Sequence, residues 1–334
     1  MRTPPRSADL LSAFPELAAH ARTATRLHPR PAPVRALDSH VGGPLRWPSD
    51  EPWPMCAHQV MVYEEVPLPL DLVTRMRQAE ARRVQHHILA EGEVELHEEI
   101  AAFVGPGFSG WGTTNNGPVV GRRTVDAPHP TPTPLIAVAQ LRAADIPDLP
   151  RPDGADLLQI LWCPFDHADT NWGPALALRW RREADVTEPF LAPPTGDVGE
   201  DEYVPEPCRL YPEQVVDYPF CQELPADLQD RLKADERYLY SAIAPGWKVG
   251  GYASWHVTDL QATPCPQCAA PTNLLFVIDS KEYDSATREY WQPLDDPDPD
   301  DAQEPTGVIV GRYSALRIFA CLTCPGTPIV TDLQ

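Results

Sequence analysis

Three short motifs occur twice along the chain in the same order, and this repeat constrains the fold more than any other feature. Each copy begins with Val-Gly-Gly-x-x-x-Trp, continues with an apolar run typical of a buried strand, and ends with Leu-x-Ile-x-x-Cys. The copies of the three motifs lie at 41–47 and 249–255, at 135–140 and 274–279, and at 158–163 and 316–321. Such a repeat predicts an internal duplication into two lobes.

The spacing between the motifs differs in the two copies and locates insertions. Trp47 lies 88 positions before Leu135, whereas Trp255 lies 19 positions before Leu274. We therefore expect a first lobe with a long insert of helices and loops, a Pro- and acid-rich connector, and a second lobe with a shorter, acidic insert. The predicted boundaries are 1–186 with an insert at about 54–134, 187–206, and 207–334 with an insert at about 291–305.

Proline is abundant, with 41 residues among 334, and it interrupts both helices and strand interiors. The apolar runs that predict strands are correspondingly short, and one of these predicted strands lies at 308–312. Helical patterns are few and lie at 71–89, 94–104 and 225–240. These patterns predict an α+β fold of short, mostly antiparallel strands with a few helices.

Two Cys-x-x-Cys turns lie in the second lobe, and 52 residues separate them. They contain Cys265, Cys268, Cys321 and Cys324. A Cys-x-x-Cys turn directs two thiolates at one ion, and two such turns complete the tetrahedral site that zinc prefers. Two disulfides or four free thiols are the alternatives, and a cytoplasmic location argues against disulfides. Four thiolates leave no open position, so we expect a structural zinc ion.

The repeat also suggests a second metal site in the first lobe. Cys163 aligns with Cys321, and Cys56 lies at nearly the same distance after Trp47 as Cys265 does after Trp255. His58 and His167 follow these cysteines closely, so Cys56, His58, Cys163 and His167 form a candidate ligand set. A decayed site, with its cysteines packed as small buried side chains, is the alternative that we favour from the sequence.

The charge of the chain excludes several classes of partner. The chain has 27 Lys and Arg against 48 Asp and Glu, a net charge of −21. Such a field repels nucleic acids and anionic membrane surfaces, but it leaves a basic protein partner open. No apolar run is long enough to span a bilayer, and no secretory leader is evident, so we expect a cytoplasmic protein.

The Gly-Gly-x-x-x-Trp segments and the Leu-rich strands that end in Gln or Asp resemble the YwqG-like family, also known as domain of unknown function 1963. The matching stretches are 41–48, 134–141, 155–163, 248–255, 274–280 and 306–320. Members have a Gly-Asp-x-Gly-like turn before the last strands, whereas this chain has Glu304-Pro305-Thr306-Gly307 there. The resemblance implies a duplicated α+β fold in a bacterial cytoplasm, without an established activity. It also implies an association with toxin–immunity systems.

The sequence therefore favours a binding or interaction protein, immunity-like and neutralising a basic partner such as a toxin, over an enzyme. We find no convincing Ser/His/Asp or Cys/His arrangement for catalysis. The alternative is a small-molecule-binding protein or enzyme with its site in a cleft between the two lobes. Trp47, Gln140, Trp255 and Asp279 are the candidate residues that line such a cleft.

Overall fold

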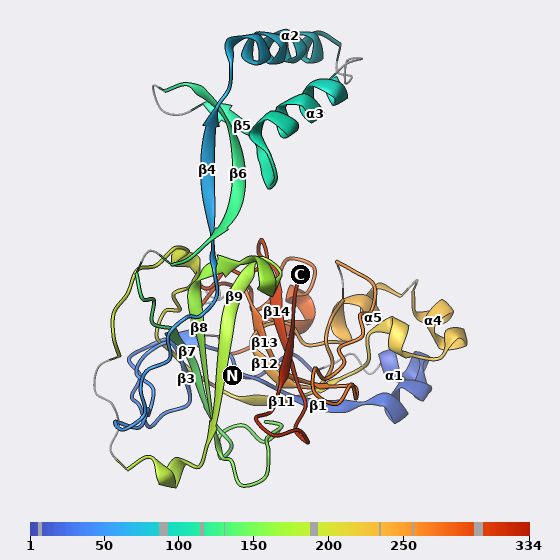
Figure 1. The fold of residues 1–334 in the computed structure, drawn as a ribbon. Coiled ribbons are helices and arrows are strands. Elements are labelled where there is room, and N and C mark those ends of the chain that lie inside the picture. Colours follow the sequence, from blue (N-terminus) through green and yellow to red (C-terminus); the bar gives the residue numbers. More distant parts are fainter. Residues whose placement is uncertain are drawn as a thin grey trace. The chain divides into compact units, whose positions relative to one another are not determined.

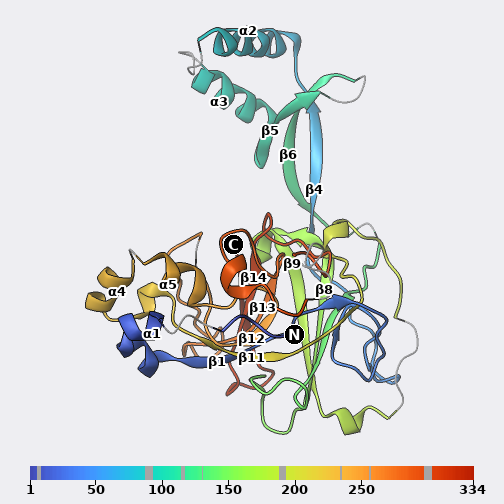
Figure 2. The ribbon, with the colours of Figure 1, turned by 180° about the vertical axis from the view of Figure 1, so that it is seen from behind.

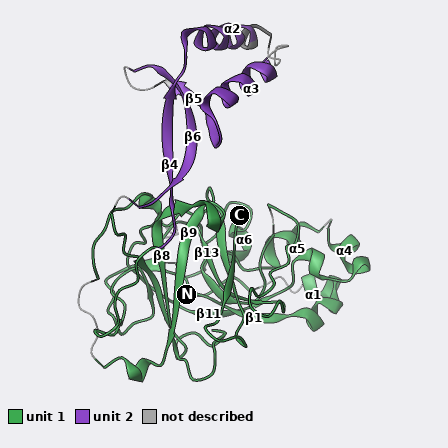
Figure 3. Ribbon diagram, in the orientation of Figure 1, with its two compact units in different colours: residues 1–56, 131–334 green, residues 57–130 purple. Residues whose placement is uncertain are grey.

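The computed structural model of the protein describes residues 1–5, 9–86, 93–113, 117–129, 131–187, 193–233, 235–255, 257–296 and 303–334. The chain forms two compact units (Figure 3). Unit 1 comprises Met1–Cys56 and Thr131–Gln334, and unit 2 comprises Ala57–Pro130. The predicted acidic insert is described only in part, because 297–302 lie outside the described residues, as do 188–192 of the predicted connector.

Unit 1 contains two sheets of six described strands each, which we call sheets A and B (Figure 1). In spatial order, sheet A consists of β11 (Glu213–Asp217), β1 (Arg22–Arg26), β12 (Lys248–Gly250), β13 (Asn273–Asp279), β14 (Ala315–Ala320) and β15 (Ile329–Leu333). Sheet B consists of β2 (Arg30–Pro31), β10 (Cys208–Arg209), β3 (His40–Val41), β7 (Ile136–Arg142), β8 (Leu157–His167) and β9 (Gly173–Arg181). All of these neighbours pair antiparallel.

The three strands that carry the repeated motifs, and the strand that follows them, have the same order in both sheets. Sheet B places them as β3-β7-β8-β9 and sheet A as β12-β13-β14-β15. In each first strand the Val of the Val-Gly-Gly motif pairs with the next strand, Val41 with Ala139 and Val249 with Phe276. The common order fits the repeat, and the duplication itself remains a prediction.

The two sheets share one hydrophobic core. Val138 and Ile160 of sheet B pack in the same buried cluster as Phe276 and Ile318 of sheet A. The strands are buried along most of their length, as in β8 and β14, which explains why they appear in the sequence as nearly continuous apolar runs. The predicted strand at 308–312 is wrong: the chain has no strand there, although Val308 and Val310 are buried in this core.

Short helices gather at one side of unit 1, where α1 (Asp9–Ala13), α4 (Ala226–Leu232) and α5 (Glu236–Ser241) lie together (Figure 2). Leu228 and Leu232, four residues apart, face the cluster that these helices share. The predicted helix at 225–240 forms as two helices, because Asp235 caps a new one by accepting from the Arg237 N–H. The remaining helical elements of unit 1 are η1 (Pro15–His20), η2 (Ala168–Thr170), η3 (Glu183–Asp185), η4 (Asp201–Tyr203), η5 (Cys221–Glu223) and α6 (Arg288–Trp291).

Unit 2 is a three-stranded antiparallel sheet with two helices. The strand order is β4 (Val60–Pro67), β6 (Val119–Ala127) and β5 (Phe108–Thr113). The helices are α2 (Leu70–His86) and α3 (Glu93–Val104). Leu96, Ile100 and Val104 recur at every fourth residue and bury one face of α3.

The fold is therefore α+β, with mostly antiparallel strands and few helices, as predicted. Among the helices of the described ranges, none combines the length and the apolar character that a bilayer crossing requires.

Candidate functional site

The two Cys-x-x-Cys turns lie side by side because their flanking strands pair. The first turn is closed by a bridge between Pro264 and Pro271, directly before β13. The second turn joins β14 to β15, with the Cys321 N–H donating to Pro328 O at 3.0 Å. Asn273 at the start of β13 pairs with Ala320 at the end of β14. This pairing brings together turns that are 52 residues apart in the chain.

The four thiols of these turns fit a metal ion. The Sγ atoms of Cys265 and Cys324 lie 3.9 Å apart, as do those of Cys268 and Cys321. A tetrahedron with metal–sulfur bonds of about 2.3 Å has sulfur–sulfur edges of about 3.8 Å. A disulfide needs about 2.05 Å between its sulfurs, and all four cysteines are free thiols. The cluster of Cys265, Cys268, Cys321 and Cys324 can hold a metal ion.

The electrostatics of the cluster favour the same interpretation. The Thr323 hydroxyl and backbone N–H groups lower the pKa of Cys321 to about 6. Hydrogen bonding with the thiol of Cys268, together with burial, raises the pKa of Cys324 to about 12. Neighbouring thiols cannot all ionise without a cation, and a bound metal ion supplies that charge.

A second cluster of metal-ligating side chains lies at β8. The ligand atoms of Cys56, Cys163 and His167, which all belong to unit 1, lie within 4.8 Å of one another. All three residues belong to the predicted second site. His58 is exposed and is not among them.

Sheet A carries a pocket of about 890 Å³ on the face that is turned away from the shared core. The strand register places the floor of this pocket. Lys248 of β12 pairs with Val277 of β13, which in turn pairs with Arg317 of β14. Paired residues share a face, and so do residues two apart in one strand. Asp279 and its partner Ala315 therefore lie on this face as well.

Lys248 is fully buried in the floor and belongs to an ion pair. Its Nζ donates to Asp217 Oδ2 at 2.6 Å and to Tyr252 O at 2.8 Å. Asp217 also accepts from the backbone N–H groups of Ala244 and Tyr252. Both charges are thus paired and hydrogen-bonded, as charges in a low-dielectric interior must be.

Arg317 is the second buried cation of the floor. Its guanidinium donates to Ser254 O and pairs with Asp332. It also lies over the Trp255 ring, 4.6 Å from the centroid, and Trp255 stacks on Phe319. Burial lowers the pKa of Arg317, whereas Asp332 and Asp279 raise it. The guanidinium Nε is buried without a hydrogen-bond partner among the described residues.

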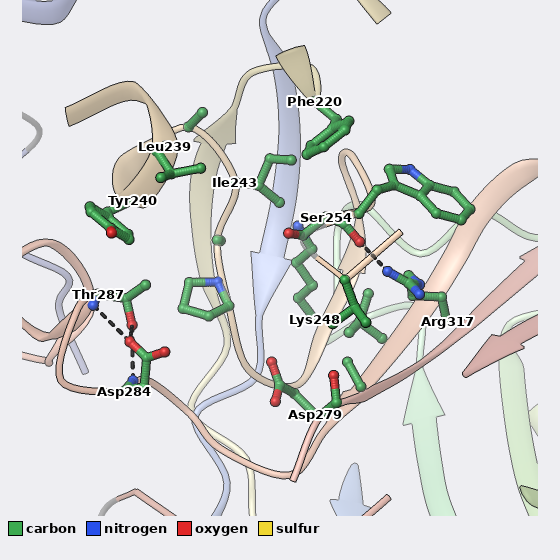
Figure 4. Close-up of a pocket in the computed structure, with 18 of the residues that line it drawn as sticks. Phe220, Leu239, Tyr240, Ile243, Lys248, Ser254, Asp279, Asp284, Thr287 and Arg317 are labelled. Carbon is green, nitrogen blue, oxygen red and sulfur yellow. Dashed lines mark hydrogen bonds between the residues drawn. The ribbon is translucent and has the colours of Figure 1, made fainter. Parts of the chain in front are cut away.

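Asp279 is the acidic group of the floor, and its carboxylate points into the pocket (Figure 4). Burial raises the pKa of Asp279 to about 6, against the lowering effect of the backbone N–H groups of Lys281 and Gly246. The charge of Asp284 raises this pKa further, and the charge of Lys248 lowers it. Because Lys248 and Arg317 pair with other carboxylates, Asp279 is the floor charge that a ligand can neutralise.

The walls of the pocket are mainly apolar and aromatic. Figure 4 shows Phe220, Leu239 and Ile243 across from Asp279. Tyr238, Tyr283 and Tyr313 add aromatic surface. A large apolar cavity with a few converging polar groups is the usual form of a small-molecule site.

Of the four residues predicted to line a cleft, Trp255 and Asp279 line this pocket. Trp47 and Gln140 do not, because both are buried elsewhere, Trp47 in a cluster with Leu161 and Gln140 within β7 of sheet B. The Trp47 ring N–H donates to Glu51 O, and Gln140 donates to Ala36 O and Asp38 O. The chain itself therefore covers the equivalent face of sheet B.

The sequence analysis missed Lys248 and Arg317. Lys248 carried a signal, since it directly precedes the second Val-Gly-Gly motif and is one of only three lysines. Arg317 lies inside the Leu-x-Ile-x-x-Cys motif, where a cation in an apolar run was a signal as well.

No protein-family model matches this chain, and neither does any curated protein.

Proposed function

We propose that this protein binds a small molecule in the pocket of sheet A, and that a structural zinc ion holds that sheet together. The observation that carries the proposal is Asp279, a half-buried carboxylate with a pKa raised to about 6 in the floor of the 890 Å³ pocket. Keeping such a group in a cavity costs stability, and sites that bind ligands or catalyse reactions are where such costs are retained.

The charges of the pocket indicate the class of ligand. Lys248 and Arg317 are already neutralised by Asp217 and Asp332, which leaves Asp279 to attract a cation. The aromatic and aliphatic walls favour an apolar body. The ligand that fits best is an aromatic or aliphatic amine whose ammonium donates to Asp279.

Zinc is the metal that the four-cysteine cluster favours. Thiolates select zinc, iron–sulfur clusters and copper(I), and a tetrahedral site of four thiolates on two Cys-x-x-Cys turns is typical of structural zinc. With all four positions taken by Cys265, Cys268, Cys321 and Cys324, the ion has no place for a substrate. Its contribution is to fix the ends of β13, β14 and β15.

Binding of 2-phenylethylamine, measured by titration calorimetry at pH 7.5, tests the proposed function, with phenylacetic acid as the ligand of opposite charge. The amine is expected to bind and the acid to fail. Asp279→Asn is expected to weaken amine binding at least about tenfold, the size of one charge-assisted hydrogen bond. Asp259→Asn is the matched control, because Asp259 also lines the pocket but its carboxylate accepts a hydrogen bond from the Gln222 side chain. Equal binding of acid and amine refutes the assignment.

A basic protein partner is the second candidate, and the net charge of −21 favours it. The immunity-like role, the cytoplasmic location and the YwqG-like family remain predictions from the sequence. A basic protein that co-purifies with this chain should dissociate in about 1 M salt, where screening acts within about 3 Å. A complex that survives such salt contradicts the electrostatic account.

A further inference from the structure

The second cluster gains its geometry from an irregularity in β8. Trp162 pairs with Leu176 and Asp166 pairs with Pro174, so β8 carries two more residues than β9 across this step. In a regular strand, residues four apart are separated by about 13 Å, which is too far for one ion. The bulge shortens this distance, and the ligand atoms of Cys163 and His167 lie within 4.8 Å of each other.

Cys56 reaches the same place through a separate piece of backbone. Its N–H donates to Thr133 O at 2.8 Å, next to a bridge between Met55 and Pro134. Its Sγ lies 3.7 Å from His167 Nε2. Cys163 and His167 are fully buried, and Cys56 packs with Cys163 against Trp47 and Leu161. Three ligand atoms from two chain segments thus converge in an apolar setting within unit 1.

We propose that Cys56, Cys163 and His167 bind a second tetrahedral metal ion, with zinc as the ion that their donor atoms favour. Two thiolates and one imidazole supply three of the four positions of a tetrahedral zinc site. The inference does not depend on the proposed pocket ligand.

A decayed site, favoured from the sequence, does not account for this arrangement. The aligned position of Cys268 has no cysteine in the first half, and a decayed site would leave Cys56 and Cys163 without further donors. Instead, His167, which has no counterpart in the four-cysteine cluster, joins them. It is placed by a strand bulge, a feature that families retain for a purpose.

Elemental analysis of the protein after loading with zinc and removal of excess metal tests the proposal. We expect two zinc ions per chain in the wild type and one in Cys163→Ser and in His167→Asn. Cys221→Ser is the matched control and should retain both ions, because Cys221 lies outside both clusters. The four-cysteine site monitors folding, since a misfolded variant would lose both ions rather than one.

X-ray absorption at the zinc edge separates the two donor sets. The wild type should show imidazole scattering, and Cys268→Ser, which removes a ligand of the four-cysteine site, should increase the nitrogen share of the remaining signal. One zinc per chain with sulfur-only ligation, or a zinc content unchanged by Cys163→Ser and His167→Asn, would overturn the proposal.

Discussion

Asp279 should make the stability of the protein depend on pH in a way that one substitution removes. Burial raises the pKa of this carboxyl from 3.8 to about 6. The folded state therefore binds more protons than the unfolded state between these two values, so stability falls as the pH rises through this window. About one pH unit above the folded-state pKa of about 6, the destabilising effect of the ionised carboxylate is nearly complete.

The magnitude follows from the two pKa values. For a group that titrates at 3.8 unfolded and at about 6 folded, linkage gives a loss of about 1.4 kcal/mol between pH 5 and pH 7.5. Asp279→Asn abolishes this titration. The asparagine side chain also turns an N–H group toward one of the two backbone N–H donors, those of Gly246 and Lys281. The resulting loss of stability does not depend on pH and therefore cancels when the two pH values are compared.

Thermal unfolding of the zinc-loaded protein at pH 5 and pH 7.5 measures the effect. The difference in Tm between the wild type and Asp279→Asn should shift by about 2 °C between the two pH values, with the variant gaining at pH 7.5. Asp259→Asn should show no such shift, because Asp259 is exposed to solvent. A pH-independent difference between the wild type and Asp279→Asn refutes the claim that Asp279 is held at a raised pKa in the pocket.

Three further substitutions test the framework around the pocket. Cys268→Ser should remove one zinc ion per chain and lower the Tm strongly, because structural zinc contributes about 10 kcal/mol or more to folding; Cys221→Ser should do neither, as elemental analysis and calorimetry can show. Asp217→Asn leaves the buried Lys248 without its charge partner and should lower the free energy of unfolding by about 3–5 kcal/mol, measured with denaturant. Its control, Asp230→Asn, breaks an exposed pair with Lys233 and should lower it by less than about 1 kcal/mol. Gly251→Ala would place a Cβ 2.3 Å from Asp217 Oδ2 and 2.8 Å from Ala24 Cβ at φ +71°, and it should lower the free energy of unfolding by at least about 3 kcal/mol. Its control, Gly154→Ala, has φ +81° and no atom within 4 Å of the new Cβ, and it should lower the free energy by only about 1–2 kcal/mol. Equal losses of stability in Asp217→Asn and Asp230→Asn, or in Gly251→Ala and Gly154→Ala, would contradict the packing described for the floor of the pocket.

The four-cysteine cluster was predictable because each pair of its ligands lies within four consecutive residues. A Cys-x-x-Cys turn places two thiolates together whatever the surrounding fold, and two turns need only one strand pairing to meet. The pairing of β13 with β14 supplies it. The second cluster also needs the bulge in β8, which the sequence does not reveal.

The alignment of the two repeats is shifted by two residues from the register of the strands at the pocket. Aligning the apolar runs matches Gln140 with Asp279, and this match suggested a symmetric cleft. In the structure Gln140 pairs with His40, and Val277 pairs with Lys248, so Gln140 has the place of Val277. Asp279 thus corresponds to no cleft residue in sheet B. Strand register is set by turns and bulges, here between Ala137 and Ala139, and a sequence pattern of apolar residues does not reveal it.

The breaks in the predicted elements have local causes as well. The first N–H groups of a helix have no acceptor within the helix, and the Asp235 carboxylate accepts from one of them, that of Arg237. A new helix, α5, therefore begins after Asp235. Val308 and Val310 alternate like a strand, yet the chain leaves the sheet and the Val310 N–H pairs with the Ser280 hydroxyl instead of a neighbouring strand. Periodicity predicted their burial correctly, whereas the hydrogen-bond partner decided the structure.

The affinity for 2-phenylethylamine across pH 5 to pH 7.5 tests the central claim most directly. The amine stays protonated over this range, so a change in affinity reports the ionisation of the protein. With the pKa of Asp279 at about 6 in the free protein, the account predicts that affinity rises about tenfold from pH 5 to pH 7.5 and that Asp279→Asn abolishes the rise. An affinity that is flat across this range, or that rises equally in Asp279→Asn, would contradict the assignment of this pocket as a ligand site built on Asp279.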